Sequence, residues 1–94
     1  MGNVKTLEQI PKNMRAVVAR APGDYALEEI PVPEIGPGEV LLRVKGCGIC
    51  AGDVKAFYGA PSFWGGDGQP AWIKAPFIPG HEFYGQVVAL GGGA

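Results

Sequence analysis

The 94-residue sequence contains no apolar run of the roughly 18 to 20 residues that a membrane-spanning helix needs. Its start lacks the apolar segment found in secretory signals, so the cytoplasm is the expected location. Basic residues are also few, because eight Lys and Arg against nine Asp and Glu give a formal net charge of -1. Without a basic stripe, neither a nucleic acid nor a membrane is an expected partner.

Cysteine is equally scarce, with only Cys47 and Cys50. In a reducing compartment two such residues are expected to be free or metal-bound rather than bridged. A dinucleotide-binding fingerprint is missing too, because no helix-like sequence follows Gly91-Gly92-Gly93. A nucleotide-binding fold is therefore not expected within these residues.

Glycine and proline, in contrast, are abundant, with 16 and nine residues respectively. Such a composition alone is typical of disorder, but 47% of the residues are hydrophobic and 10% are aromatic. We therefore interpret the glycines and prolines as turns between short strands. A chain of this length is expected to form one domain at most, with a modest core.

Short apolar segments bounded by turn residues predict most of the secondary structure. Four of them are expected to be strands: residues 14–20, 25–30, 40–46 and 83–90. Residues 51–58 have a helical pattern instead, with Val54, Phe57 and Tyr58 on one face. Residues 60–74, rich in Gly, Pro and aromatic side chains, predict an irregular loop over the site.

These elements predict one mainly β domain, an all-β or β-rich barrel with a short helix, which we assign to residues 14–94. Residues 1–13 mix polar and apolar side chains without a clean period and contain Pro11. They are predicted to be an N-terminal extension that lies over the domain or frays from it.

Two short clusters carry the side chains with chemical potential. Cys50 and Asp53 lie where the strand ending near residue 46 gives way to the predicted helix, and His81 and Glu82 follow a later turn. A thiol, an imidazole and carboxylates are the ligands that Zn²⁺ takes from proteins. The start of a helix also favours the thiolate form of Cys50. The sequence therefore predicts a metal site if the two clusters meet in space.

The same clusters resemble the zinc-dependent medium-chain alcohol and polyol dehydrogenases. That family carries a G-I-C-x-x-D element followed by a G-H-E element, and here residues 48–53 read G-I-C-A-G-D and residues 80–82 read G-H-E. The flanking sequence agrees as well, from about Met14 to the end of the chain. The resemblance implies a GroES-like partial barrel, truncated before the rest of the catalytic domain and the Rossmann domain.

The resemblance also implies roles for single residues. Cys50 and His81 would bind the zinc directly, and Glu82 would coordinate it transiently or lie just behind it. Asp53 would hold the ligand histidine in orientation through a hydrogen bond. Cys50, His81 and Asp53 are thus the expected catalytic residues, and Cys50, His81 and Glu82 the expected metal-binding residues.

In the implied reaction, a small alcohol or polyol is oxidised by hydride transfer to NAD or NADP, with zinc as Lewis acid. The nicotinamide cofactor would be bound mainly by a domain absent from this chain, so the 94 residues alone are expected to be inactive. A further zinc ligand would also lie downstream. The complete enzyme is expected to be a homo-oligomer.

Gly52 departs from the family pattern, because relatives commonly place Ser or Thr there to pass the alcohol proton toward solvent. Lys55 stands where some relatives have a relay histidine, but an ordinary exposed lysine is a poor proton acceptor near pH 7. Several aromatic residues are candidates for the wall of a substrate site, or for plain core: Phe57, Tyr58, Trp64, Trp72 and Phe83.

Other interpretations remain open at the level of sequence. Cys50 by itself fits a small buried apolar residue, and His81 a structural turn residue. Cys47 and Cys50 form a C-x-x-C pattern, which is compatible with a thiol redox protein or with half of a structural zinc site, although Cys47 also fits a packing residue. A GroES-like domain is also compatible with a non-catalytic binding module. Zinc content distinguishes the module from the dehydrogenase.

Overall fold

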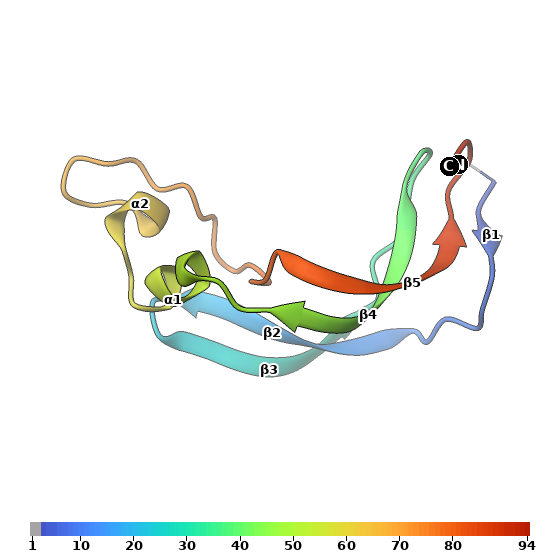
Figure 1. Ribbon diagram of the computed structural model, residues 1–94, viewed down its shortest axis with the longest axis horizontal. Coiled ribbons are helices and arrows are strands. Elements are labelled where there is room, and N and C mark those ends of the chain that lie inside the picture. The colour runs from blue at the N-terminus through green and yellow to red at the C-terminus, as the bar shows by residue number, and fades with distance from the viewer. Residues whose placement is uncertain (1–2) are drawn as a thin grey trace. The chain divides into compact units, whose positions relative to one another are not determined.

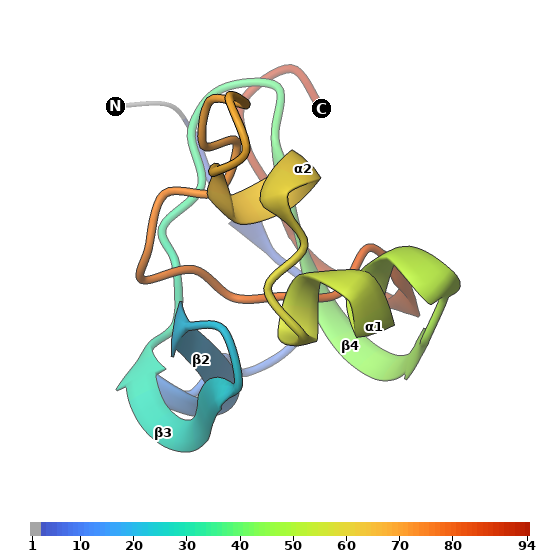
Figure 2. The same cartoon turned by 90° about the vertical axis from the view of Figure 1, so that its left-hand side faces the viewer.

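A computed structural model describes residues 3–94 (Figure 1, and turned by 90° in Figure 2). Its elements are, in chain order, β1 (Lys5–Thr6), β2 (Asn13–Ala21), β3 (Asp24–Pro31), β4 (Val40–Gly48), α1 (Ala51–Phe57), α2 (Pro61–Trp64) and β5 (Glu82–Leu90). The mainly β fold, the four predicted strands and the predicted helix are confirmed. Neither helix in the described residues has the length and apolar character needed to cross a membrane.

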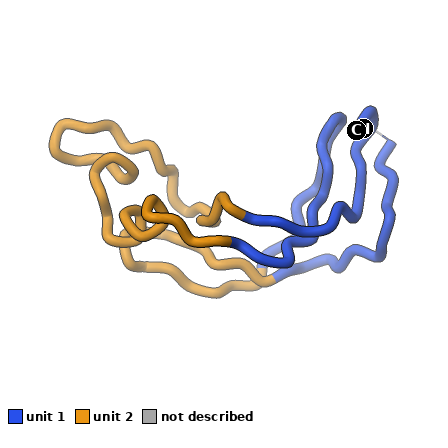
Figure 3. Tube along the Cα trace, in the orientation of Figure 1, with its two compact units in different colours: residues 1–14, 30–47, 83–94 blue, residues 15–29, 48–82 orange. Residues whose placement is uncertain are grey.

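The described residues separate into two compact units, coloured differently in Figure 3. The first unit combines the residues up to Met14 with Ile30–Cys47 and Phe83–Ala94. The second combines Arg15–Glu29 with Gly48–Glu82. Every residue of the two predicted chemical clusters belongs to the second unit.

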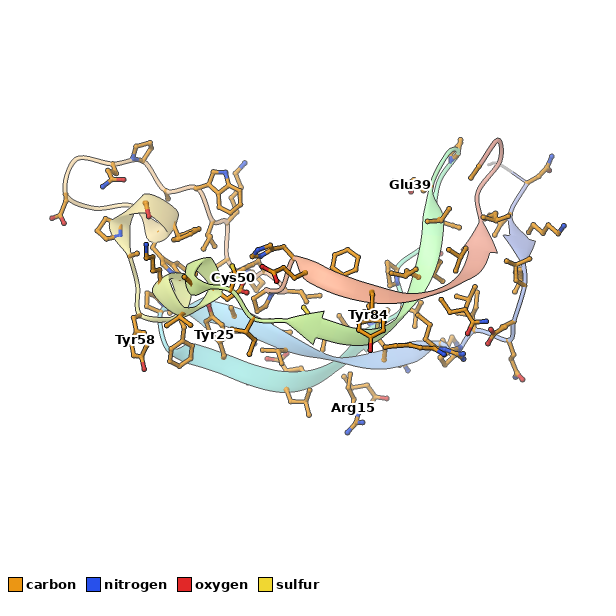
Figure 4. The ribbon with its side chains drawn as sticks, in the orientation of Figure 1. Arg15, Tyr25, Glu39, Cys50, Tyr58 and Tyr84 are labelled. Atoms are coloured by element: carbon orange, nitrogen blue, oxygen red, sulfur yellow. The ribbon has the colours of Figure 1, made fainter. Side chains whose placement is uncertain are left out.

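In the first unit, β5 lies between β1 and β4 in a three-stranded sheet. Strand β1 runs antiparallel to β5, and Lys5 lies opposite Leu90. Part of the predicted extension 1–13 is thus paired with a strand, while residues 1 and 2 lie outside the described part; the boundary at residue 13 stays a prediction. Tyr84 of β5, labelled in Figure 4, covers Gly46 of β4 so closely that a Cβ at Gly46 would overlap its ring. A glycine covered by a cross-strand aromatic ring is a common way to keep a sheet packed at a position without a side chain.

In the second unit, β2 and β3 pair through the two-residue connection Pro22-Gly23, where Gly23 has a φ of 71°. The positive φ explains the glycine, since other residues avoid it. On β2, Ala19 is fully buried and exchanges two backbone hydrogen bonds with Phe77, of 2.8 and 3.0 Å. This bridge fixes the segment that leads to His81 against β2.

The predicted irregular loop 60–74 differs from expectation, because it begins with the four-residue helix α2. Pro61 at the first helical position favours the turn, and Gly65 with a φ of 90° ends it. The Trp64 indole N–H donates to the carbonyl of Ala56, at 2.6 Å, and the Trp64 ring packs edge-on against Phe77. The loop is therefore held against α1 by the second unit's own core.

Candidate metal centre

Cys50 is the residue that caps the start of α1. It has an extended backbone, and its N–H donates to Oδ2 of Asp53 at 2.9 Å. A carboxylate three residues into a helix is well placed to accept from the first N–H groups, which lack partners within the helix. The spacing Cys50-x-x-Asp53 therefore brings the thiol and the carboxylate to one end of α1, as the sequence pattern indicates. Figure 4 labels Cys50 at this position.

His81 follows the loop 60–74 in the sequence and lies beside Cys50 and Asp53 in the structure. Its Nε2 atom lies 3.2 Å from Sγ of Cys50, and its Nδ1 atom lies 3.3 Å from Oδ1 of Asp53. The two ring nitrogens thus face different groups, and the imidazole is held between them. Side-chain exposure is 60% for His81 and 21% for Asp53, so the histidine is open to solvent while its carboxylate partner is more protected.

Glu82 approaches the histidine from the side on which Cys50 lies. Its Oε2 atom is 3.6 Å from Nε2 of His81. Gly48 makes room for this carboxylate, because a Cβ at Gly48 would lie only 3.0 Å from Oε1 of Glu82. The Nε2 atom of His81 is therefore shared by a thiol and a carboxylate, while Nδ1 faces Asp53 alone among the described residues.

The donor atoms fit a zinc ion in type and in spacing. Ligand atoms of Cys50, Asp53 and His81 all lie within 4.8 Å of one another. A tetrahedral zinc with bonds of about 2.3 Å to sulfur and about 2.0–2.1 Å to nitrogen would separate these two atoms by about 3.5 Å. The observed 3.2 Å between Sγ of Cys50 and Nε2 of His81 is close to that separation. The structure thus brings together all four residues that the sequence pattern singled out.

The other residues that the sequence offered as candidates have different surroundings. Lys55 is exposed, in keeping with a solvated side chain. Cys47 is exposed on β4, and it belongs to the first unit, as does Phe83. Trp64 has a packing role through its bond to Ala56, and Tyr58 is 80% exposed.

Phe63 is a neighbour of the site that sequence reasoning did not single out. A Cβ built on Gly52 would lie 3.4 Å from Sγ of Cys50 and 3.8 Å from Cζ of Phe63. The ring of Phe63 therefore lies beside Gly52 in the first turn of α1. The only sequence signal for it was an aromatic residue in a long loop, which says nothing about direction.

Tyr25 was also missed. Its hydroxyl is buried and has no hydrogen-bond partner in the described part of the chain, and its ring contacts Phe57 and Phe77 edge-on, at centroid distances of 4.8 and 6.5 Å. Burial raises the pKa of the Tyr25 hydroxyl, and the negative charge of Asp53 raises it further. Tyr25 is therefore a neutral residue at physiological pH that packs against Phe57 of α1.

Comparison with known proteins gives a consistent picture. Residues 36–94 match the family model described as alcohol dehydrogenase GroES-like domain. An erythritol/L-threitol dehydrogenase from Mycolicibacterium smegmatis is 54% identical over 82 residues, which cover 87% of this chain and 23% of that protein. A sorbitol dehydrogenase from Ovis aries is 41% identical over 76 residues, covering 81% of this chain and 20% of that protein.

A third relative, the (R,R)-butanediol dehydrogenase of Neisseria gonorrhoeae, is 43% identical over 74 residues, covering 76% of this chain and 21% of that protein. The chain thus spans less than a quarter of the length of these curated relatives. No solved structure matches it. The family model covers well over half of the chain, and its GroES-like description agrees with the partial barrel predicted from the sequence. The chain belongs to the alcohol dehydrogenase GroES-like domain family.

Proposed function

We propose that this chain is part of the catalytic domain of a zinc-dependent dehydrogenase that oxidises an alcohol or polyol by hydride transfer to NAD or NADP. The observation that carries the proposal is the environment of His81. One ring nitrogen faces a thiol and a carboxylate, and the other faces Asp53. The relatives named above, which act on polyols and a diol by name, support the substrate class.

Cys50 and His81 are the residues that would hold the zinc, through Sγ and Nε2. Glu82 lies close enough to join them or to stand just behind the ion, because its carboxylate is 3.6 Å from Nε2 of His81. Bound zinc would supply a Lewis acid that favours the alkoxide form of the alcohol and orients its carbinol hydrogen. The exposure of His81 leaves this side of the site open to a small molecule.

Asp53 would keep the histidine ready for the metal. With Nδ1 3.3 Å from Oδ1, a proton on Nδ1 points at the carboxylate, and the lone pair of Nε2 is then directed toward Cys50. The same carboxylate accepts from the N–H of Cys50, so one side chain positions both proposed ligands. Its role is positioning rather than direct chemistry.

The other partners follow from the same proposal. The nicotinamide cofactor would be bound mainly by residues outside this chain, the substrate would be a small alcohol or polyol, and the complete enzyme would be a cytoplasmic homo-oligomer. The direct test is to purify the complete enzyme, measure zinc per subunit and follow reduced-cofactor absorbance with a panel of alcohols and polyols. Zinc without hydride transfer, or neither, would refute the proposal.

Asp53→Asn is expected to weaken zinc binding by about 10- to 100-fold, the usual cost of removing an outer partner of a metal-binding histidine. The amide keeps the size of the side chain but loses the negative charge that favours a proton on Nδ1. Chelator competition on the complete enzyme measures the change. Asp67→Asn is the matched control, because Asp67 is exposed in a turn with a φ of 50°, which Asn tolerates. Equal zinc affinity in the two variants would contradict the role of Asp53.

Gly52→Ser is expected to fold normally and to shift the pH dependence of hydride transfer. The added Cβ meets Cys50 and Phe63 only at ordinary contact distances of 3.4 and 3.8 Å, and serine is a better helix residue than glycine. The new hydroxyl adds a group able to pass the alcohol proton. Thermal unfolding and the pH profile of kcat check both parts. A profile identical to that of the parent would show that position 52 takes no part in proton transfer.

A further inference from the structure

The space beside Cys50 is bounded by an aromatic ring instead of a polar side chain. Gly52 contributes no side chain, and Cζ of Phe63 lies 3.8 Å from the point where its Cβ would stand. Sγ of Cys50 lies 3.4 Å from that same point. An apolar edge therefore stands next to the thiol that is proposed to bind the metal.

Backbone hydrogen bonds within the loop hold Phe63 in place. Its carbonyl accepts hydrogen bonds from the N–H groups of both Trp72 and Ile73, each at 2.8 Å. Ile73 is buried, with 8% of its surface exposed, which anchors the part of the loop that follows Trp72. The rings of Phe63 and Trp72 meet edge-on, with centroids 6.1 Å apart. The two rings are therefore in edge-on contact, and we call this pair the aromatic surface of the loop.

Trp72 remains 75% exposed although it is held at both its backbone and its ring. A large, fixed and exposed aromatic side chain suits contact with the C–H groups of a ligand, because it loses little conformational freedom on binding. A polyol presents such C–H groups along its carbon chain, alternating with hydroxyls. A carbon chain that leaves Cys50 on the side of Gly52 would meet Phe63 first, because Sγ of Cys50 and Cζ of Phe63 lie 3.4 and 3.8 Å from the same point.

We propose that Phe63, continued by Trp72, determines which alcohols the enzyme accepts by packing against the substrate carbons beyond the reacting one. This inference rests on the proposed function, since it needs an alcohol at the metal centre. It assigns the selectivity for chain length to the loop 60–74, not to the metal-binding residues.

The test compares Phe63→Ala, Phe63→Leu and Trp72→Ala in the complete enzyme, with Leu27→Ala as the control. Leu27 is a 63% exposed apolar residue of β3 in the same unit. Kinetics are measured with linear alcohols and polyols of two to six carbons, together with zinc content and thermal unfolding. Calorimetric binding of the same alcohols to enzyme loaded with reduced cofactor, where no turnover occurs, gives a second readout.

Phe63→Ala is expected to raise KM and the dissociation constant about tenfold for four- to six-carbon polyols, and to change them less than about twofold for two-carbon alcohols. Phe63→Leu, which keeps an apolar side chain and guards against a folding defect, should recover part of the loss. Trp72→Ala should affect only the longest substrates, and Leu27→Ala none. Zinc content should stay the same throughout.

Two results would overturn the inference. One is an active parent enzyme whose Phe63 and Trp72 variants keep the parent's substrate profile. The other is a uniform loss of kcat for alcohols of every length, which would show a structural role only. A parent enzyme that binds zinc and oxidises no alcohol would refute the proposed function itself, and this inference with it.

Discussion

Replacing Cys50 with Ser, or His81 with Ala, is expected to abolish stoichiometric zinc binding and turnover in the complete enzyme. Sγ of Cys50 and Nε2 of His81 are 3.2 Å apart, so each side chain would supply one of two neighbouring ligand atoms to the zinc ion. Loss of either leaves too few ligands for tight binding, and serine is a poor replacement because an alcohol oxygen does not ionise near pH 7 as a metal-bound thiol does.

Cys47→Ser serves as the matched control for this experiment. It is the same chemical change at the other cysteine, three residues earlier, on an exposed position of β4. Metal analysis and steady-state kinetics are expected to show parent-like values for this variant. Loss of zinc in the Cys47 variant alone would reverse the assignment of the two cysteines. Equal loss of zinc in the two cysteine variants, with zinc retained in His81→Ala, would point to a C-x-x-C site instead.

The isolated 94-residue polypeptide is expected to be catalytically silent even with zinc and a nicotinamide cofactor present. The chain spans 23% of the length of the Mycolicibacterium relative, and its described residues form only sheets and two short helices. Nothing among them resembles the strand–glycine turn–helix that binds a dinucleotide. Hydride transfer needs the cofactor and alcohol fixed together, a positioning effect worth about 7 to 11 kcal/mol.

This second prediction is checked by adding zinc, NAD or NADP and a panel of polyols to the purified polypeptide and following reduced-cofactor absorbance. A binding measurement by calorimetry with zinc alone accompanies it, because weak metal binding is compatible with silence. Turnover comparable to that of a complete relative would show that the active site lies elsewhere. Comparison with the complete enzyme then separates the zinc binding that these residues provide from the cofactor binding that the rest of the enzyme must add.

Local chemistry allowed much of this structure to be predicted. Residues 40–46 and 83–90 are short apolar segments bounded by turn residues, and both form strands, β4 and β5. The helix predicted over 51–58 forms over Ala51–Phe57, because the i, i+3, i+4 spacing of its apolar residues and the acidic Asp53 in its first turn are both local signals. The structure of the loop 60–74 could not be predicted in the same way, because it contains the helix α2. A four-residue helix such as α2 has little stability of its own, and it forms here because Trp64 packs against Phe77 and bonds to Ala56.

By itself, the sequence determined the identity of the candidate ligands and the geometry of the nearer pair, since the spacing of Cys50 and Asp53 fixes both at the start of one helix. Only the tertiary structure decided that His81, 31 residues after Cys50, closes the site, and which of its ring nitrogens faces which group. It also placed Phe63 beside Gly52. The physical reason is that contacts within a turn follow from backbone geometry, whereas contacts across a loop depend on where distant segments pack.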